Sequence, residues 1–309
     1  MAIGRRRIGG YANTWLRKFF VSAHEPHKVV HAFDPRVCYR GSDVVTIYDL
    51  IPFTPPYNRA DTFSYWHKFV HDIHLKEVRF VQTISEFSKA EILRRYDIPR
   101  DRIVVTYPGV DHELFQPSKK VPVVFQTPKL KLLFVGANRP TRNVPALVEA
   151  MRYLPDVRLV LLGPQHDPKV SGQVDALRKT YSLDVVVEGY VPVSELPSYY
   201  SSADLSVMLS NIDGFGGLPN LEAMACGTSV VVTDIPVYRE VLGDLPHYVP
   251  LHGKTIPDPK DVAETIQSAA ENPRSHQELR GFCQRFTWRE AAQSTLGIYQ
   301  EVAKEKGLT

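Results

Sequence analysis

The chain has 309 residues, of which 43% are hydrophobic and 23% charged, so it is long enough for two ordinary globular domains. Its formal net charge of +3 is too small to indicate nucleic acid as a partner, and we expect none. The cysteines are odd in number and widely spaced, which excludes a disulfide framework and a cysteine zinc site and favours a cytoplasmic protein. No apolar run reaches the roughly 18 residues that a spanning helix needs.

The first residues combine basic and aromatic side chains. Residues 5–20 start with Arg5-Arg6-Arg7 and continue with apolar residues at helical spacing that end at Phe20. A basic aromatic helix can lie on an anionic membrane, which for a cytoplasmic protein is a peripheral contact at the inner face. The other interpretation, which we favour, places these apolar side chains in the core. A helix with two faces satisfies both.

Short apolar runs then alternate with helical segments, the pattern of an α/β fold with mostly parallel strands. Strands are expected at residues 28–33, 42–47, 79–84 and 103–106. Helices are expected at 62–76 and 85–96, the second capped by Ser85. On the first of these helices, His67, His71 and His74 share one face. No fourth ligand is evident, so we expect this face to pack against the sheet or to be exposed to water, and we expect no metal.

Residues 117–128 carry three prolines and are interpreted as a connection between domains. A second α/β series follows, with strands expected at 130–135, 158–162, 184–187, 205–209 and 229–233. Its helices are expected at 144–153, 194–202, 259–272 and 287–305. We therefore expect two domains, residues 1–118 completed by the helix 287–309, and residues 128–284. A cleft between them is the usual place for a ligand.

Residues 213–228 (DGFGGLPNLEAMACGT) carry the most specific signal. They place Asp213 and Glu222 on either side of a Gly/Pro loop that opens into a short helix. The amide groups at such a helix start favour an anion. One carboxylate on each side of that anion suits the hydroxyl groups of a nucleotide-sugar, which has a sugar, a diphosphate and a ribose in that order. The alternative is a surface aspartate and an ordinary helix glutamate.

A basic loop, with Arg139 and Arg142, follows the first strand of the second series. An arginine fork pairs two phosphate oxygens, so these side chains are candidates to hold a diphosphate. The alternative is a solvated basic loop in which Asn143 caps the next helix. The chain has no Asp-x-Asp, so neither a divalent cation nor another cofactor is implied.

The motifs together resemble glycosyltransferase family 4, the retaining GT-B enzymes. The resemblance runs in order through residues 44–52, 83–88, 107–111, 134–143, 189–191, 213–228 and 286–288. It implies a GT-B-like fold of two Rossmann-like domains facing a cleft, with the first domain reduced. It also implies that a hexosyl group moves from a nucleotide-sugar donor to a glycan, lipid-linked or small-molecule acceptor, with retained configuration and without a metal.

The resemblance assigns residues to three roles. Asp213, Arg142 and Arg139 are implied to be catalytic, by orienting the sugar or holding the diphosphate. Residues on the acceptor side are implied to be Gly9, Gly10, Tyr48 and Asp49. The donor is implied to contact Glu222, through its ribose, and the loop and turn residues Gly214, Phe215, Gly216, Gly217, Leu218, Gly189, Tyr190 and Val191.

The chain departs from the family pattern at three positions. Eight residues separate Asp213 from Glu222, one more than is usual, and the first carboxylate is Asp instead of Glu. Ala137 replaces a common arginine, for which Arg139 is the substitute, and Tyr48 replaces a common histidine. These departures keep open a second interpretation, a non-catalytic GT-B-like protein that binds a nucleotide or a partner. A nucleotide-sugar epimerase is a third.

Overall fold

The computed structural model describes residues 27–34, 41–51, 75, 77–154 and 156–308. The chain divides into two compact units, one of Met1–Tyr107 with Glu290–Thr309 and the other of Pro108–Arg289. We call them unit 1 and unit 2. Both hold a parallel sheet with helices, which confirms the expected α/β fold class.

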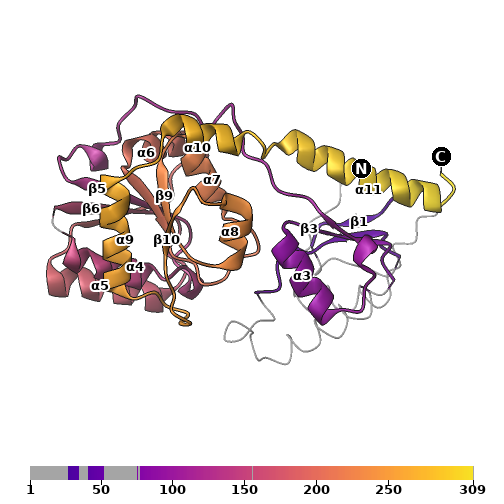
Figure 1. Cartoon of the computed structure of the whole chain (residues 1–309), viewed down its shortest axis with the longest axis horizontal. Helices are drawn as coiled ribbons and strands as arrows, with labels where there is room; N and C mark the ends of the chain where they lie inside the picture. The colour runs from indigo at the N-terminus through magenta and orange to yellow at the C-terminus, as the bar shows by residue number, and fades with distance from the viewer. Residues whose placement is uncertain (1–26, 35–40, 52–74, 76, 155, 309) are drawn as a thin grey trace, which may run out of the picture. The chain divides into compact units, whose positions relative to one another are not determined.

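Unit 2 contains a six-stranded sheet in which every paired strand is parallel. Its strands are β5 (Leu130–Val135), β6 (Val157–Leu162), β7 (Val185–Gly189), β8 (Leu205–Met208), β9 (Ser229–Thr233) and β10 (His247–Val249). Its helices are α4 (Val144–Ala150), α5 (Pro168–Tyr181), α6 (Leu196–Ser202), α7 (Leu218–Ala225), α8 (Pro236–Leu242), α9 (Pro259–Glu271) and α10 (His276–Cys283). Helices α4, α5 and α9 pack together on one face, and α6, α7 and α10 on the other (Figure 1).

This two-sided cover explains the strand sequences. Strands buried on both faces need near-continuous apolar runs, and every residue of β8 and β9 is buried. The longer helices begin at aspartate caps: Asp167 accepts from two amides of α5, and Asp258 from one of α9. The structure also contains α5, α8, β10 and α10, which the sequence pattern does not indicate.

The strand order β10-β9-β8-β5-β6-β7 places a reversal between β5 and β8. The chain adds β6 and β7 on one side of β5, then returns to add β8, β9 and β10 on the other. In open sheets of this kind, the loops after the two strands at the reversal diverge and leave room for a ligand. Here those loops follow Val135 and Met208.

Unit 1 contains a parallel four-stranded sheet in the order β1 (His31–Ala32), β2 (Val44–Thr46), β3 (Phe80–Thr83) and β4 (Ile103–Val105). One face packs with Ile92 of α3 (Glu86–Arg95), which Ser85 caps as expected. The other face packs with Ile298 and Val302 of α11 (Trp288–Glu305). The last helix of the chain therefore completes the core of unit 1.

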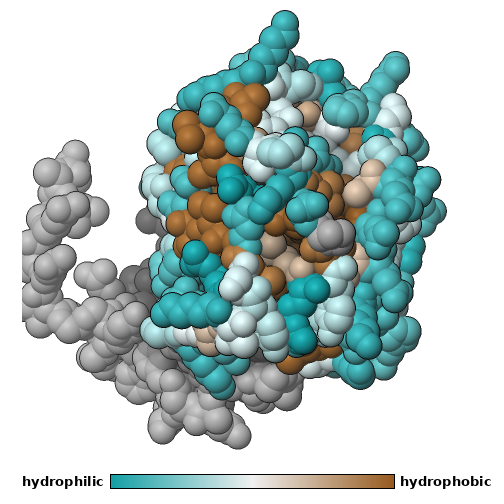
Figure 2. Space-filling model, turned by 90° about the vertical axis from the view of Figure 1, so that its left-hand side faces the viewer, coloured by the Kyte–Doolittle hydropathy of each residue, from teal (hydrophilic) through white to brown (hydrophobic). Residues whose placement is uncertain are grey.

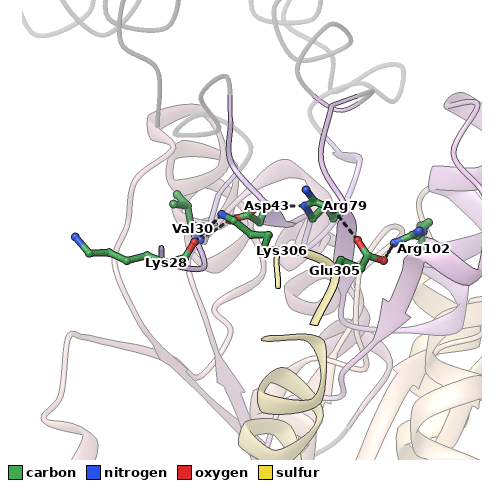
Figure 3. Close-up of polar contacts among 7 residues, drawn as sticks. All are labelled: Lys28, Val30, Asp43, Arg79, Arg102, Glu305 and Lys306. Atoms are coloured by element: carbon green, nitrogen blue, oxygen red, sulfur yellow. Dashed lines mark hydrogen bonds and ion pairs between the residues drawn. The ribbon is translucent and has the colours of Figure 1, made fainter. Parts of the chain in front are cut away.

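Charged side chains fasten the end of α11 to the sheet (Figure 3). Lys306 Nζ lies 3.0 Å from Asp43 Oδ2 and 2.6 Å from the Lys28 carbonyl oxygen. Glu305 accepts from Arg79 at 2.9 Å and from Arg102 at 2.5 Å. Because the side chains of Lys306 and Asp43 are only 8% and 7% exposed, this pair is buried.

The division between units differs from the expected boundary at residue 118. It falls at Tyr107, and residues 117–128 pack on unit 2. The Ser118 amide donates to Ser201 Oγ, and Arg158 donates to the Val124 carbonyl. These contacts make the proline-rich segment part of unit 2.

The face of unit 2 in Figure 2 carries hydrophobic side chains in separate patches among hydrophilic ones. At the β7 edge of the sheet, Val187 is 37% exposed and Tyr190 is 77% exposed. Within the described residues, no helix has both the length and the apolar character needed to cross a bilayer.

Candidate functional site

The two loops at the strand reversal bring Arg142 and Asp213 into contact. Arg142 ends the 3₁₀ turn Pro140–Arg142 that follows β5, and Asp213 lies in the loop after β8. Arg142 Nη1 donates to Asp213 Oδ2 and to Ser210 Oγ, both at 2.6 Å. The two side chains are 28% and 11% exposed, so the ion pair is largely buried.

A buried tyrosine lies against this ion pair. Tyr238 of α8 is fully buried, and its hydroxyl group lies 3.4 Å from Asp213 Oδ2. Burial first, and then the charge of Asp213, raises the pKa of Tyr238, so the phenol stays neutral. Burial alone lowers the pKa of Arg142, but Asp213 and Tyr238 outweigh it and raise that pKa. The guanidinium therefore remains a cation in this partly desolvated place.

Two glycines after Asp213, Gly216 and Gly217, are required by close packing and by backbone conformation respectively. Asp213 Oδ1 accepts the Phe215 amide at 3.0 Å, which turns the loop inward. A Cβ at Gly216 would lie 2.6 Å from Val241 Cγ1, and Gly217 has φ +72°. Gly214 lies between Asp213 and Phe215 in this turn. The Phe215 ring packs edge-on against Phe286, with ring centroids 6.2 Å apart. The loop is thus closely packed.

Glu222 lies one turn into α7, which begins at Leu218 with Pro219 in its first turn, as expected. The Tyr200 hydroxyl group, on α6, donates a hydrogen bond to Glu222 Oε2 at 2.8 Å. Burial raises the pKa of Glu222, and the bond from Tyr200 opposes that rise. Asn220 is fully buried and donates to the Gly216 carbonyl at 2.8 Å, which ties the loop to the helix.

Three glycines end the neighbouring strands β5, β6 and β7. Gly136, Gly163 and Gly189 all have positive φ, and a Cβ at Gly163 would lie 2.3 Å from the Gly136 carbonyl oxygen. The Gly163 amide donates to the Gly189 carbonyl at 2.7 Å. Tyr190 and Val191 follow, the first exposed and the second half-buried. These strand ends therefore present backbone in place of side chains.

The other expected site residues make none of the contacts described above. Arg139 is exposed, at the start of the turn that Arg142 ends. In unit 1, Tyr48 is 47% exposed and Asp49 Oδ1 accepts the Ile51 amide at 2.9 Å. Gly9, Gly10, the segment 5–20 and the three histidines at 67, 71 and 74 lie outside the described residues. The part of the chain that the structure describes has no group of three or more His, Cys, Asp or Glu able to hold a metal.

One expectation needs revision, and three site residues must be added. Asn143 does not cap α4 through its side chain, because Nδ2 donates to the Leu209 and Thr255 carbonyls and φ is +49°. It therefore ties the Arg142 turn to the loop after β8. Sequence reasoning also missed Tyr200, Tyr238 and Ser210, since nothing in their spacing links them to the carboxylates or to the arginine.

Comparisons with known proteins identify the family of the chain. The family model described as "Glycosyl transferases group 1" matches residues 116–282. The chain is 31% identical over 280 residues to O-antigen chain mannosyltransferase B of Escherichia coli, covering 83% of this chain and 70% of that protein. It is 29% identical over 211 residues to O-antigen chain mannosyltransferase RfbU of Salmonella typhimurium, covering 67% of this chain and 56% of the relative.

The structure is also similar to that of sucrose-phosphate synthase from Thermosynechococcus elongatus. The TM-score is 0.74 at 21% identity, covering 90% of this chain and 74% of the other. At this identity the likeness concerns the fold alone. It confirms the expected GT-B class with Rossmann-like units.

Proposed function

Because the chain belongs to the group 1 glycosyl transferases, we propose that it moves a hexosyl group from a nucleoside-diphosphate sugar to an acceptor. The observation that carries the proposal is the contact of Arg142 with Asp213 at the strand reversal, with Glu222 on the helix that follows. Along the chain, one carboxylate lies on each side of the loop that contacts Arg142 through Asp213, which suits a diphosphate with a sugar on one side and a ribose on the other. We assign the enzyme to the retaining, family 4 type.

In the proposed reaction, Arg142 carries the main electrostatic role. Breaking the bond between sugar and phosphate builds positive charge on the sugar ring and negative charge on the departing diphosphate. An arginine held in a partly desolvated place stabilises that negative charge without having to reorganise. Removing one such donor typically costs about 2.7–4 kcal/mol of barrier. The diphosphate replaces Asp213 as a partner of the guanidinium, and exposed Arg139 adds a second positive charge.

The exchange at Arg142 also releases a carboxylate. Once the diphosphate holds the guanidinium, Asp213 accepts hydrogen bonds from the hydroxyl groups of the sugar. Glu222 accepts those of the ribose, and the turn of Gly189, Tyr190 and Val191, in which Tyr190 is exposed, faces the base. We place Gly9, Gly10, Tyr48 and Asp49 on the acceptor side. Side-chain cations supply the positive charge in this proposal, so we expect turnover to survive EDTA.

The relatives suggest which substrates to test first. Two of them are named as mannosyltransferases of an O-antigen chain, so we propose a mannose donor and a glycan or lipid-linked acceptor. A peripheral membrane contact through residues 5–20 would bring the enzyme to a lipid-linked acceptor. The transferase names do not favour the alternative of a non-catalytic nucleotide-binding protein.

The test compares Glu222→Gln with Glu264→Gln, a matched change at an exposed position of α9. Both variants are incubated with GDP-, UDP-, ADP- and TDP-linked sugars and candidate acceptors, with and without EDTA. Hydrogen bonds to charged groups contribute about 1.5–3 kcal/mol, so Glu222→Gln should weaken donor binding by at least tenfold. Glu264→Gln should match the wild type. Wild-type turnover by Glu222→Gln, or nucleotide release without product across the panel, would contradict the proposal.

A further inference from the structure

Tyr200 is held rigidly behind Glu222. Its side chain is fully buried in unit 2. Its carbonyl oxygen accepts from Thr228 Oγ1 at 2.7 Å, and its ring lies edge-on to Phe115, with centroids 6.2 Å apart. The hydroxyl group that donates to Glu222 therefore comes from a fixed point in the core.

The hydrogen bond has a defined direction of proton donation. Burial, followed by the charge of Glu222, raises the pKa of Tyr200 well above its usual range, so the phenol keeps its proton. The carboxylate is thus the acceptor, and a bond of this kind to an ionised group is among the stronger ones. Because it engages Oε2 alone, it fixes the rotation of the carboxylate and so the direction in which Oε1 points.

We propose that Tyr200 is a positioning residue for nucleotide binding: it aims the Glu222 carboxylate at the ribose hydroxyl groups. This inference rests on the proposed function, which gives the ribose to Glu222. A flexible glutamate loses side-chain entropy when it binds a ligand. A glutamate already held by a buried phenol has lost that freedom in advance, so binding costs less.

One other titratable group, Cys226, lies close enough to Glu222 to interact with it electrostatically. Cys226, at the end of α7, has its pKa raised to about 12 by burial and by the charge of Glu222. Arg280 of α10 acts electrostatically on Cys226. A thiol with that pKa is neutral at physiological pH. Tyr200 is therefore the neighbour whose hydrogen bond keeps Glu222 ionised against the effect of burial.

The competing explanation is that the hydrogen bond merely ties α6 to α7. A contact with only a structural role would affect the stability of the protein. It would not change the preference of the protein for ribose over deoxyribose in the bound nucleotide. Binding of GDP and UDP is therefore compared with binding of their 2′-deoxy and 3′-deoxy analogues by calorimetry. The proteins are the wild type, Tyr200→Phe, Glu222→Gln and the double variant. The control is Tyr199→Phe, which removes a buried neighbour's hydroxyl group that lies 3.5 Å from Glu188 Oε2.

We expect Tyr200→Phe to bind the ribonucleotides about tenfold more weakly and to lose most of the preference over a deoxy analogue. In the Glu222→Gln background the same change should have little further effect, because the shared interaction is already gone. Tyr199→Phe should keep the wild-type preference. In a titration followed by ¹³C NMR of labelled glutamate carboxyl groups, Tyr200→Phe should raise the pKa of Glu222.

Three results would overturn the inference. The first is an unchanged ribose preference and an unchanged Glu222 titration in Tyr200→Phe while Glu222→Gln weakens binding, which leaves the proposed function standing. The second is a loss of stability with the preference intact, which makes Tyr200 a structural tie. The third is wild-type binding by Glu222→Gln, which removes the ribose role of Glu222 and the inference with it.

Discussion

Replacing Lys306 with Met tests how firmly the end of α11 is fastened to unit 1. Methionine keeps the apolar stem but removes the ammonium group, which lies 3.0 Å from Asp43 and 2.6 Å from the Lys28 carbonyl. Removing one partner of a buried ion pair typically costs about 3–5 kcal/mol. In the variant, Asp43 still accepts a hydrogen bond from the Val30 amide at 2.9 Å and still pairs with Arg79 at 3.4 Å. We therefore expect the free energy of unfolding to fall by a smaller amount, about 2 kcal/mol.

Amide hydrogen exchange measures this loss locally, without assuming that the two units unfold together. A loss of about 2 kcal/mol should speed exchange in peptides of α11 about 30-fold, while α9 of unit 2 stays unchanged. The control is Lys304→Met, at an exposed position in the last turn of the same helix, where we expect less than about 0.5 kcal/mol. Equal protection of α11 in the two variants would refute the argument from burial.

Two further predictions concern the loop after β8 and the core of unit 1. Gly216→Ala should destabilise unit 2 by about 2 kcal/mol, because its Cβ would lie 2.6 Å from Val241 Cγ1. Adding Val241→Ala should recover part of this loss, and strictly additive urea midpoints would argue against the clash. Burial lowers the pKa of His31 to about 4, and its ring nitrogens contact Tyr299 Oη at 2.7 Å and Thr46 Oγ1 at 2.8 Å. In the unfolded chain the pKa of His31 is 6.5, so between pH 6.5 and pH 4 the unfolded chain binds a proton that the folded chain does not. The free energy of unfolding, at its full value above pH 6.5, should therefore fall as the pH drops toward 4. His31→Gln should flatten this dependence in urea titrations across the same range, and an identical slope in both proteins would count against it.

Most strands of the two sheets were predictable because strands covered on both faces need apolar runs. β5 and β9 show this most clearly, as their runs coincide with the observed bounds. Helix α5 was not predicted, because it buries only Val170 and Val174 and contains Gly172, so its amphipathic pattern is weak. Strand β10 lies at the edge of the sheet, buries only Val249 and begins with His247, so it lacks a continuous apolar run.

The candidate site was predictable only in part, for a related reason. Arg142 and Asp213 stand out individually, as a basic side chain and a carboxylate in glycine-containing loops. Their contact depends on the strand order, which places β8 beside β5 although two strands intervene along the chain. Tyr200 and Tyr238 lie in helices with buried apolar neighbours, where a tyrosine is ordinarily a core residue. Only the fold shows where their hydroxyl groups point.

The placement of α11 has a consequence for synthesis on the ribosome. Most domains complete their folding as they emerge, at about 5–20 residues per second. The face of the unit 1 sheet formed by Val44, Phe80 and Val104 is covered by α11, which begins at Trp288. About 180 residues separate the end of the first segment of unit 1 from that helix, a delay of about 10–40 s. During that time unit 2 can fold while the apolar face stays uncovered, so this face is where a chaperone would bind the nascent chain.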